Sequence, residues 1–307
     1  MLNDLILPLL CMLSLGYVSF KWQWVNQALI TGLSQFIIKI ALPAFLVAAL
    51  ARKNLQQLWL PDYMFAYALG SLLCFWLAFG VYRRVFQATL TQASVLAMGA
   101  SMSNTGFIGS ALMMLLLGTQ GAIYLSLSLI IENLCVVAVM LTLAEAGQHK
   151  QLGRRQLIQQ TAVKLAKNPI MLAIAVGMVL AALELPLPQG LFIALERVGQ
   201  TASPLALFVI GAGLVGISLR AIDIKSGVLV SFKLLLMPLC IFALLYGLDA
   251  SPETLYAGTL LAALPMPISF ALFAEHYGMK QQALAPLMLS TVLGFPLLAL
   301  LLSQWQF

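Results

Sequence analysis

Long apolar runs dominate this chain, and they limit it to a membrane fold. A helix needs about 20 mostly apolar residues to cross the hydrocarbon core of a bilayer. Ten segments meet that requirement: Leu5–Phe20, Gln27–Ala51, Tyr63–Tyr82, Ala93–Leu117, Ala122–Ala144, Pro169–Leu185, Ser203–Leu219, Gly227–Leu248, Leu255–Tyr277 and Ala283–Leu302. Only 8% of the residues are charged, whereas a soluble domain carries about 25%. The runs do not alternate with a period of two, which excludes transmembrane β-strands. The sequence therefore predicts an all-α integral membrane protein with ten transmembrane helices.

Basic residues gather on one set of the connections between these spans, and this predicts the orientation of the chain. That set holds Lys21, Arg83, Arg84, Lys150, Arg154, Arg155, Lys164, Lys167, Arg220, Lys225 and Lys280. The opposite set holds Arg52, Lys53 and Arg197. Because loops rich in Lys and Arg stay in the cytoplasm, we expect both termini outside the cytoplasm, in a bacterial inner (plasma) membrane. Orientation and contact with membrane lipid account for the net charge of +6 without a nucleic-acid partner.

The longest connection divides the chain into two groups of five spans. We expect a first repeat at residues 1–144, a basic cytoplasmic loop at 145–168 and a second repeat at 169–307. Because five is an odd number, the second group enters the membrane from the opposite side, so the two groups are predicted to be inverted repeats. Inverted repeats are a common plan of secondary transporters, whose substrate binds near the membrane midplane between the repeats.

A shift of 161 residues brings landmarks of the two halves into register. Gly16 falls on Gly177, and Asn104 falls on Pro265. The second pair lies in the fourth span of each half, where both helices are expected to break.

The two predicted breaks have different causes. Gly99–Gly109 carries Ser, Asn and Thr in the middle of an apolar span, and these residues weaken a continuous helix. Ala263–Phe270 contains Pro265 and Pro267, which donate no N–H, and we expect a new half-helix to begin near Pro267.

Unwound backbone at membrane depth is tolerated only where protein buries it or a wet cavity receives it. Two breaks at matched positions therefore predict a transport site, and the positive N-termini of the half-helices suit an anion. The candidate substrate-binding residues are Ser103, Asn104, Thr105, Gly106, Pro265, Met266, Pro267 and Ser269. The alternative interpretation is a pair of kinks repaired by neighbouring helices.

Ionisable residues inside the spans are costly and are candidates for function. Lys39 either counters an anionic substrate or extends to the lipid headgroups. Glu132, next to Asn133, is a candidate to carry a coupling proton or to help bind a cation. The alternative is a packing hydrogen bond or a pair with Lys39 or Lys233. Lys233 is expected to reach the headgroups, because it lies near the cytoplasmic end of its span.

Several short motifs resemble those of the auxin efflux carrier family of membrane transporters, which includes bacterial organic-acid carriers. They occur in order along the whole chain, at Ala41–Phe45, Asn104–Gly109, Lys167–Pro169, Lys233–Pro238, Ala263–Pro265 and Ala274–Gly278. The chain departs from the family pattern at Ala111, where a proline is common, and at Ser269, where an asparagine is common. Both positions line the expected crossing, so the identity of the substrate stays open.

The resemblance implies a fold similar to that of sodium/proton antiporters and bile-acid symporters. In that fold, broken spans four and nine cross within a transport domain of spans 3–5 and 8–10, beside a scaffold of spans 1, 2, 6 and 7. It also implies elevator-like alternating access, a homodimer, and a substrate site at Asn104 with its neighbours and at Pro265–Ser269.

These observations favour a secondary transporter for a small organic anion, such as malonate, malate or an indole acid, with a proton or sodium as possible coupling ion. A cation/proton antiporter or sodium symporter on the same fold, or a channel or non-transporting subunit, remains an alternative. An enzyme is not expected, because the spans carry no H-E-x-x-H and no paired aspartates. No cofactor or metal site is predicted, and no ATP-binding G-x-x-x-x-G-K-[ST] occurs.

Overall fold

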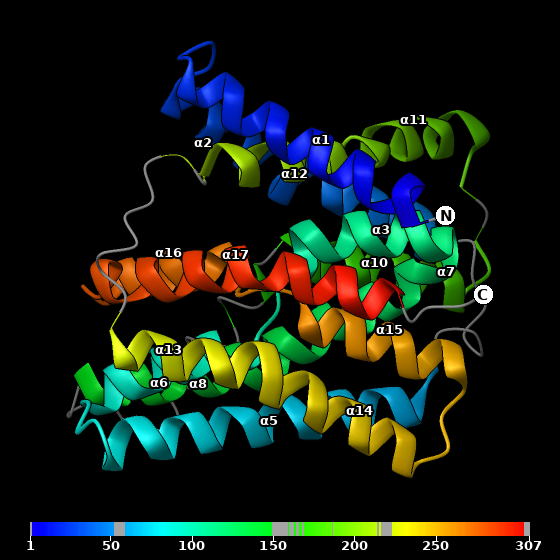
Figure 1. The fold of residues 1–307 in the computed structure, drawn as a ribbon. Helices are drawn as coiled ribbons and strands as arrows, with labels where there is room; N and C mark the ends of the chain where they lie inside the picture. Colours follow the sequence, from blue (N-terminus) through cyan, green and yellow to red (C-terminus); the bar gives the residue numbers. More distant parts are fainter. Residues whose placement is uncertain are drawn as a thin grey trace. The chain divides into compact units, whose positions relative to one another are not determined.

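A computed structural model describes residues 2–51, 59–148, 159, 163, 166–167, 169–185, 187–213, 215 and 223–303 (Figure 1). The chain forms two compact units. Unit 1 comprises Met1–Leu60, Thr105–Ser126 and Lys167–Ile217, and unit 2 comprises Pro61–Asn104, Leu127–Ala166 and Ser218–Phe307. Most of the connection at 145–168 lies outside the described residues, as do Arg52, Lys53 and Arg220.

Regular structure in the described part of the chain is entirely helical, which confirms the all-α prediction. The helices of unit 1 are α1 (Leu2–Lys21), α2 (Gln27–Phe36), α3 (Leu42–Leu50), α10 (Pro169–Ala182), α11 (Gln189–Gln200) and α12 (Ala202–Gly213). Those of unit 2 are α5 (Pro61–Arg84), α6 (Leu90–Ser101), α8 (Ala138–Gln148), α13 (Ile224–Ser231), α14 (Met237–Gly247), α15 (Pro252–Ala263), α16 (Ile268–His276) and α17 (Lys280–Ser303). Helix α7 (Ser110–Ile131) begins in unit 1 and ends in unit 2.

Seven helical stretches of the described chain are long and apolar enough to cross a membrane. They are Gln27–Leu50, Pro61–Arg84, Leu90–Gln148, Gln189–Gly213, Ile224–Gly247, Pro252–Ala271 and Gln281–Ser303. At 1.5 Å per residue, a straight helix as long as the third stretch would measure about 90 Å, far more than a core of about 30 Å. That stretch therefore holds more than one crossing. The total of ten spans stays a prediction.

The stretch Gln189–Gly213 differs from the predicted seventh span, Ser203–Leu219. Helix α11 lies in the predicted connection before that span, the one that holds Arg197. It is amphipathic, with buried Phe192 and Gly199 on one face and exposed Arg197 on another. The end of the predicted span, from Val215 on, lies mostly outside the described residues.

Unit 1 packs through very close helix crossings. A Cβ atom added to Gly16 on α1 would lie 2.0 Å from the Phe208 carbonyl oxygen of α12. On the other helix, a Cβ at Gly211 would lie 2.0 Å from the Leu13 carbonyl oxygen. The two backbones therefore touch directly, as small residues allow in membrane helices.

Unit 2 packs α5 against α6 and α14 (Figure 1). Gly70 on α5 leaves room for Ile241 on α14, because an added Cβ would lie 2.6 Å from the Ile241 Cγ1. Tyr63 and Tyr67 on α5 are fully buried, and the Tyr63 hydroxyl lies 2.6 Å from the Ser128 Oγ.

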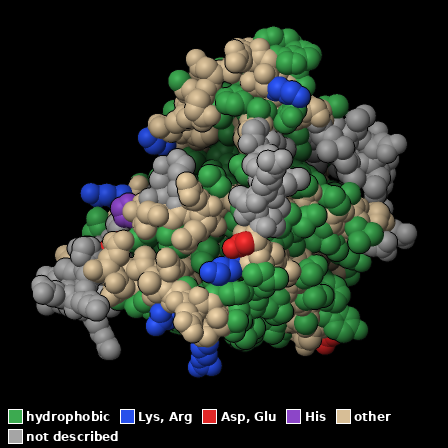
Figure 2. Space-filling model, turned by 60° about the vertical axis from the view of Figure 1, so that its left-hand side comes forward, with side chains coloured by type: hydrophobic (Ala, Val, Ile, Leu, Met, Phe, Trp, Pro, Cys, Tyr) green, Lys and Arg blue, Asp and Glu red, His purple; other side chains and the backbone are tan. Residues whose placement is uncertain are grey.

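Many hydrophobic side chains are exposed on the outer surface of the protein, and Figure 2 shows them covering much of the face drawn there. Trp76, Leu239 and Tyr246 are among the large exposed ones. Exposed apolar surface on this scale is what a lipid environment stabilises.

In the part of the chain that the structure describes, four π-helical turns interrupt the helices, at Ile37–Ala41, Thr105–Gly109, Glu132–Val137 and Phe232–Leu236. Lys39, Glu132 and Lys233, the three ionisable residues of the predicted spans considered above as candidates for function, all lie in such turns. Pi-helical turns occur frequently at functional sites. Helix α7 is also kinked at Gly118, whose φ of 53° is a conformation that favours glycine.

Candidate functional site

Both predicted helix breaks are present, and both lie in unit 2. Helix α6 ends at Ser101, and Met102 adopts an extended conformation (φ −120°, ψ 147°). Helix α15 ends at Ala263, and Leu264 is likewise extended at ψ 149°. Helix α16 begins at Ile268, directly after Pro267, as the missing proline N–H predicts.

The two breaks are hydrogen-bonded to each other. The Asn104 backbone N–H donates to the Pro265 carbonyl oxygen at 2.9 Å. The Met266 backbone N–H donates to the Ser290 Oγ of α17 at 3.2 Å. Buried backbone groups that lose their helical partners need others, and each break finds some of them at the other break or on α17.

Lys233 lies beside both breaks, and the prediction that it extends to the headgroups is wrong. Its side chain is 0% exposed. The ammonium donates to the Ser103 Oγ at 2.8 Å, to the Met237 Sδ at 3.0 Å, and to the Ala262 carbonyl oxygen. That carbonyl accepts it because its usual helical donor, the Met266 N–H, is bound to Ser290 instead.

Glu132 joins the same group of side chains. It is 1% exposed, and its Oε1 accepts hydrogen bonds from the Tyr67 hydroxyl and from the Ser103 backbone N–H, both at 3.1 Å. Ser103 thus links the carboxylate of Glu132, through its N–H, with the ammonium of Lys233, through its hydroxyl. We call Tyr67, Ser103, Glu132 and Lys233 the buried polar cluster.

The Asn104 carboxamide lies next to this cluster in the chain and is 4% exposed. It has no hydrogen-bond partner among the residues that the structure describes. A buried amide has two donors and an acceptor to satisfy, so this side chain is available to a ligand.

The remaining predicted site residues lie outside the buried polar cluster as we define it. Thr105 and Gly106 belong to unit 1. Ser269 is half-buried on the first turn of α16. Asn133 is half-buried, and its Nδ2 donates to the Leu129 carbonyl oxygen one turn earlier at 2.8 Å. Lys39 is an exposed residue of unit 1, and its ammonium lies 3.4 Å from the Gln35 Oε1.

Sequence reasoning missed three members of this region: Lys233 as a buried group, Tyr67 and Ser290. Tyr67 and Ser290 carry no local signal, since a hydroxyl in an apolar helix commonly bonds within its own helix. Lys233 carries no local signal of burial either, because Lys39 stands in a similar position before Pro43 and is exposed.

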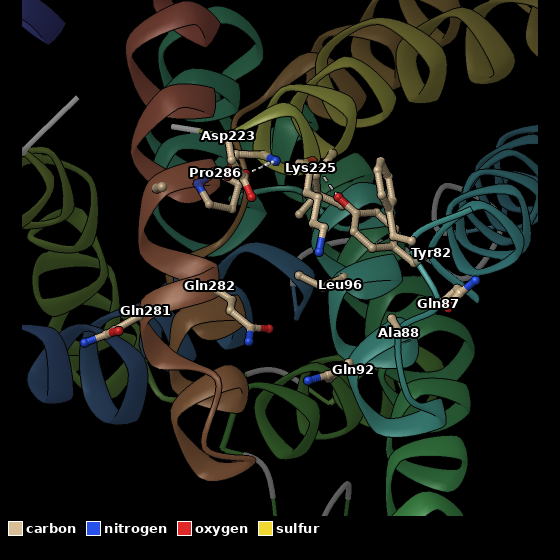
Figure 3. Close-up of a pocket in the computed structure, with 14 residues that line it drawn as sticks. Tyr82, Gln87, Ala88, Gln92, Leu96, Asp223, Lys225, Gln281, Gln282 and Pro286 are labelled. Carbon is tan, nitrogen blue, oxygen red and sulfur yellow. Dashed lines mark hydrogen bonds between the residues drawn. The ribbon is translucent and has the colours of Figure 1, made fainter. Parts of the chain in front are cut away.

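A separate cavity of about 420 Å³ lies at the end of unit 2 where α6, α13 and α17 begin. Figure 3 shows Gln92 and Gln282 beside it, with Tyr82 and Lys225 on another side. The Tyr82 hydroxyl donates to the Lys225 carbonyl oxygen at 2.6 Å. None of the predicted site residues lines this cavity.

Asp223 caps α13 at the rim of the cavity. Its Oδ1 accepts from the Ser226 N–H at 2.8 Å and from the Ser226 Oγ at 2.7 Å. Partial burial acts to raise the pKa of Asp223, but these hydrogen bonds and the nearby Lys225 outweigh it and hold the pKa below its usual value.

Comparison with known proteins places the whole chain in one group of transporters. The family described as "Membrane transport protein" matches residues 3–303. A protein named "Putative malonate transporter" from Rhizobium meliloti (strain 1021) is 26% identical over 299 residues, which cover 95% of this chain and 92% of the relative. "Uncharacterized transporter YfdV" from Escherichia coli (strain K12) is 23% identical over 300 residues, which cover 94% and 93%. The chain therefore belongs to this membrane transport protein family, the auxin efflux carrier family whose motifs it carries.

Proposed function

We propose that this protein is a secondary transporter that carries a small organic anion, a carboxylate, across the bacterial inner membrane. The observation that carries the proposal is the hydrogen bond between the two helix breaks, from the Asn104 N–H to the Pro265 carbonyl oxygen. Broken helices at corresponding positions of two halves are the best pointer to a transport site. The name of the relative from Rhizobium meliloti supports a dicarboxylate such as malonate as the first substrate to test.

The ten-span inverted repeat is part of this proposal. Under the shift of 161 residues, α1 corresponds to α10, and α12 corresponds to α3. Gly16 on α1 packs against Phe208 on α12, and Gly177 on α10 packs against Leu50 on α3. The two glycines correspond to each other under the shift, and the helices that they contact, α12 and α3, correspond as well. This reciprocity supports two halves related by an approximate two-fold axis, and the basic connections support both termini outside the cytoplasm. Elevator-like movement and a homodimer complete the proposal.

The substrate carboxylate is proposed to bind at Asn104 and at the first turn of α16, where Ser269 lies. A carboxamide offers two N–H donors, and the N-terminus of a helix carries partial positive charge. Pro265, Met266 and Pro267 shape the backbone between them, and Thr105 and Gly106 stay predicted members of the site. Lys39 is not included, because its exposure supports the interpretation in which it extends to the headgroups.

Glu132 is the proposed carrier of a coupling proton, with Asn133 as its neighbour. It is the one carboxylate that the described structure buries at the breaks. Protonation would weaken its hydrogen bond with the Ser103 N–H in the first break, so a proton and the substrate would act on the same segment.

Thermal stability of the purified protein in detergent tests the substrate class. Malonate, malate and indole acids are compared at equal ionic strength, at two pH values, with and without sodium. A ligand that binds only folded protein raises its stability by about 2.7 kcal/mol at a hundredfold excess over Kd. We expect one acid to stabilise the wild type and not Asn104→Ala. If no acid has an effect, or if the variant responds equally, the proposed site is wrong.

A further inference from the structure

We propose that the ammonium of Lys233 is a built-in cation that holds the two helix breaks in place, where other transporters with broken helices bind a metal ion, so that this transporter needs no sodium. The transport consequence rests on the proposed function, whereas the structural role of Lys233 does not. The proposal follows from three features of the buried polar cluster.

The first feature is the end of α15, which calls for a cation. Three consecutive carbonyl groups there lack the donor four residues later that a continuous helix supplies, and of these the Leu261 carbonyl oxygen accepts from the Leu264 N–H at 3.4 Å instead. Pro265 and Pro267 have no N–H for Leu261 and Ala263, and the Met266 N–H that would serve Ala262 is bound to Ser290. The C-terminus of a helix also carries partial negative charge. In transporters with broken helices, such unwound carbonyls and half-helix C-termini coordinate sodium ions.

The second feature is the way in which Lys233 fills this position. An ammonium group has three N–H donors, and Lys233 has three acceptors, on Ala262, Ser103 and Met237. Two of them belong to the two breaks: Ala262 to the end of α15, and Ser103 to the segment after α6. Because every donor is used inside the protein and the side chain is fully buried, Lys233 does not bind the substrate carboxylate itself.

The third feature is charge compensation. Glu132 lies in the same cluster and binds the backbone of Ser103, whose hydroxyl binds Lys233. The cluster thus has one positive and one negative side chain, linked through one residue. A sodium ion could bind here only by displacing the Lys233 ammonium, which is covalently attached to the chain and already bound to Ser103 and Ala262.

Chemical rescue tests the structural role. Lys233→Ala removes the ammonium and leaves a space that methylammonium or ethylammonium fits. We measure the melting temperature of the full-length variant in detergent, in choline chloride, sodium chloride, methylammonium chloride, ethylammonium chloride and tetramethylammonium chloride at equal concentration. We expect a lower melting temperature in choline and a partial recovery with methylammonium, ethylammonium or sodium. Tetramethylammonium, which has no N–H donor, should give none.

Two variants make the result specific. Lys233→Met fills the space without a charge and should be destabilised without recovery by any cation. Lys225→Ala removes an exposed lysine from the preceding helix and should melt like the wild type in every salt. The proposal is supported if a small cation raises the melting temperature of Lys233→Ala and does not raise that of Lys225→Ala or Lys233→Met. A Lys233→Met protein as stable as the wild type, or recovery of all variants alike, overturns it. If Lys233→Ala folds only when it is purified with ethylammonium, that result also supports the proposal.

Transport by the wild type in proteoliposomes tests the consequence. Replacing sodium by choline on both sides should leave malonate flux unchanged, and a flux that requires sodium overturns sodium independence. If the wild type carries none of the acids, the proposed function fails, and the melting experiment still decides the role of Lys233.

Discussion

Two lysines in this protein lie in nearly the same local structure and have opposite surroundings. Lys39 lies in the π-helical turn Ile37–Ala41, and Lys233 lies in the turn Phe232–Leu236. A proline follows each turn, Pro43 in one case and Pro238 in the other. Even the beginnings of the two spans match, because the side chains of Asn26 and Asp223 cap α2 and α13. Yet Lys39 is exposed, whereas Lys233 is fully buried.

The shared local structure has a chemical cause. A proline inside a helix donates no N–H, and its ring clashes with the carbonyl four residues earlier. A wider π turn before Pro43 or Pro238 accommodates the defect.

The different surroundings come from residues far away in the sequence. Around Lys233, the break in α6 supplies Ser103 and the end of α15 supplies Ala262. Around Lys39, the acceptor is Gln35 on the same helix, at 3.4 Å. A local motif therefore sets the position of a lysine on its helix, and the tertiary neighbours decide whether it is a surface group or part of a buried cluster. Five predictions test this difference, from the largest expected effect to the smallest.

Replacing Lys233 by Met should have the largest effect on stability. Removing one member of a buried charged group costs about 3–5 kcal/mol, because its partner is left buried and uncompensated. The free energy of unfolding measured in detergent should fall by this amount. The matched change Lys39→Met should leave it almost unaltered, and equal losses in the two variants would remove the distinction between the two lysines.

Replacing Glu132 by Gln should alter both stability and pH dependence. The carboxylate oxygen that accepts from Tyr67 and Ser103 becomes a weaker, neutral acceptor, and a hydrogen bond to a charged group contributes about 1.5–3 kcal/mol. Transport by the wild type should vary with pH if Glu132 carries the coupling proton, and the variant should lose that variation. A pH profile with the same shape in both proteins would leave Glu132 with a structural role only.

Replacing Asn104 by Ala should affect binding and not folding. Its carboxamide has no partner among the described residues, so its removal leaves no protein group unsatisfied. Loss of a hydrogen bond to a charged ligand costs about 1.5–3 kcal/mol, which is roughly a tenfold to hundredfold rise in Kd. Calorimetric titration with the stabilising acid measures this change. An unaltered Kd would place the substrate elsewhere.

The two helix caps should differ in their response to acid. Because its hydrogen bonds hold the pKa of Asp223 below the usual value, its contribution to stability is present above the unfolded pKa and is lost as the pH falls through the folded pKa. Asp223→Ala should cost about 1 kcal/mol at neutral pH and less in strong acid. Asn26→Ala should cost a similar amount with no such pH dependence, as melting curves at several pH values will measure. Parallel curves for the two variants would contradict the assignment.

Replacing Lys39 by Ala should have the smallest effect. The side chain contacts Gln35 on its own helix, and an exposed polar contact of this kind contributes roughly 0–1 kcal/mol. Malonate flux and melting temperature should both stay near the wild-type values. A strong loss of flux at unchanged stability would instead support the interpretation in which Lys39 counters the charge of an anionic substrate.

The sequence by itself was sufficient for the class of protein and for the helix breaks. Long apolar runs require helices in a bilayer, and Pro265 and Pro267 remove N–H groups wherever the chain folds, so α16 had to begin near Pro267. The family motifs are likewise a property of the chain, and the comparisons confirm them. The bounds of the seventh span were less certain: the predicted span begins at Ser203, whereas the apolar helical stretch of the structure begins at Gln189.

Only the tertiary structure decided which polar groups meet. A hydropathy profile shows how far Lys233 stands from the end of its span in the sequence. It does not show that Ser103 and Ala262 lie beside Lys233 in the folded protein. The cost of burying an ammonium depends on whether acceptors surround it, and these acceptors come from helices more than a hundred residues earlier and nearly thirty residues later in the chain. The same limit explains the difference from Lys39: their local sequences are alike, and the free energy of each side chain is determined by the helices packed around it.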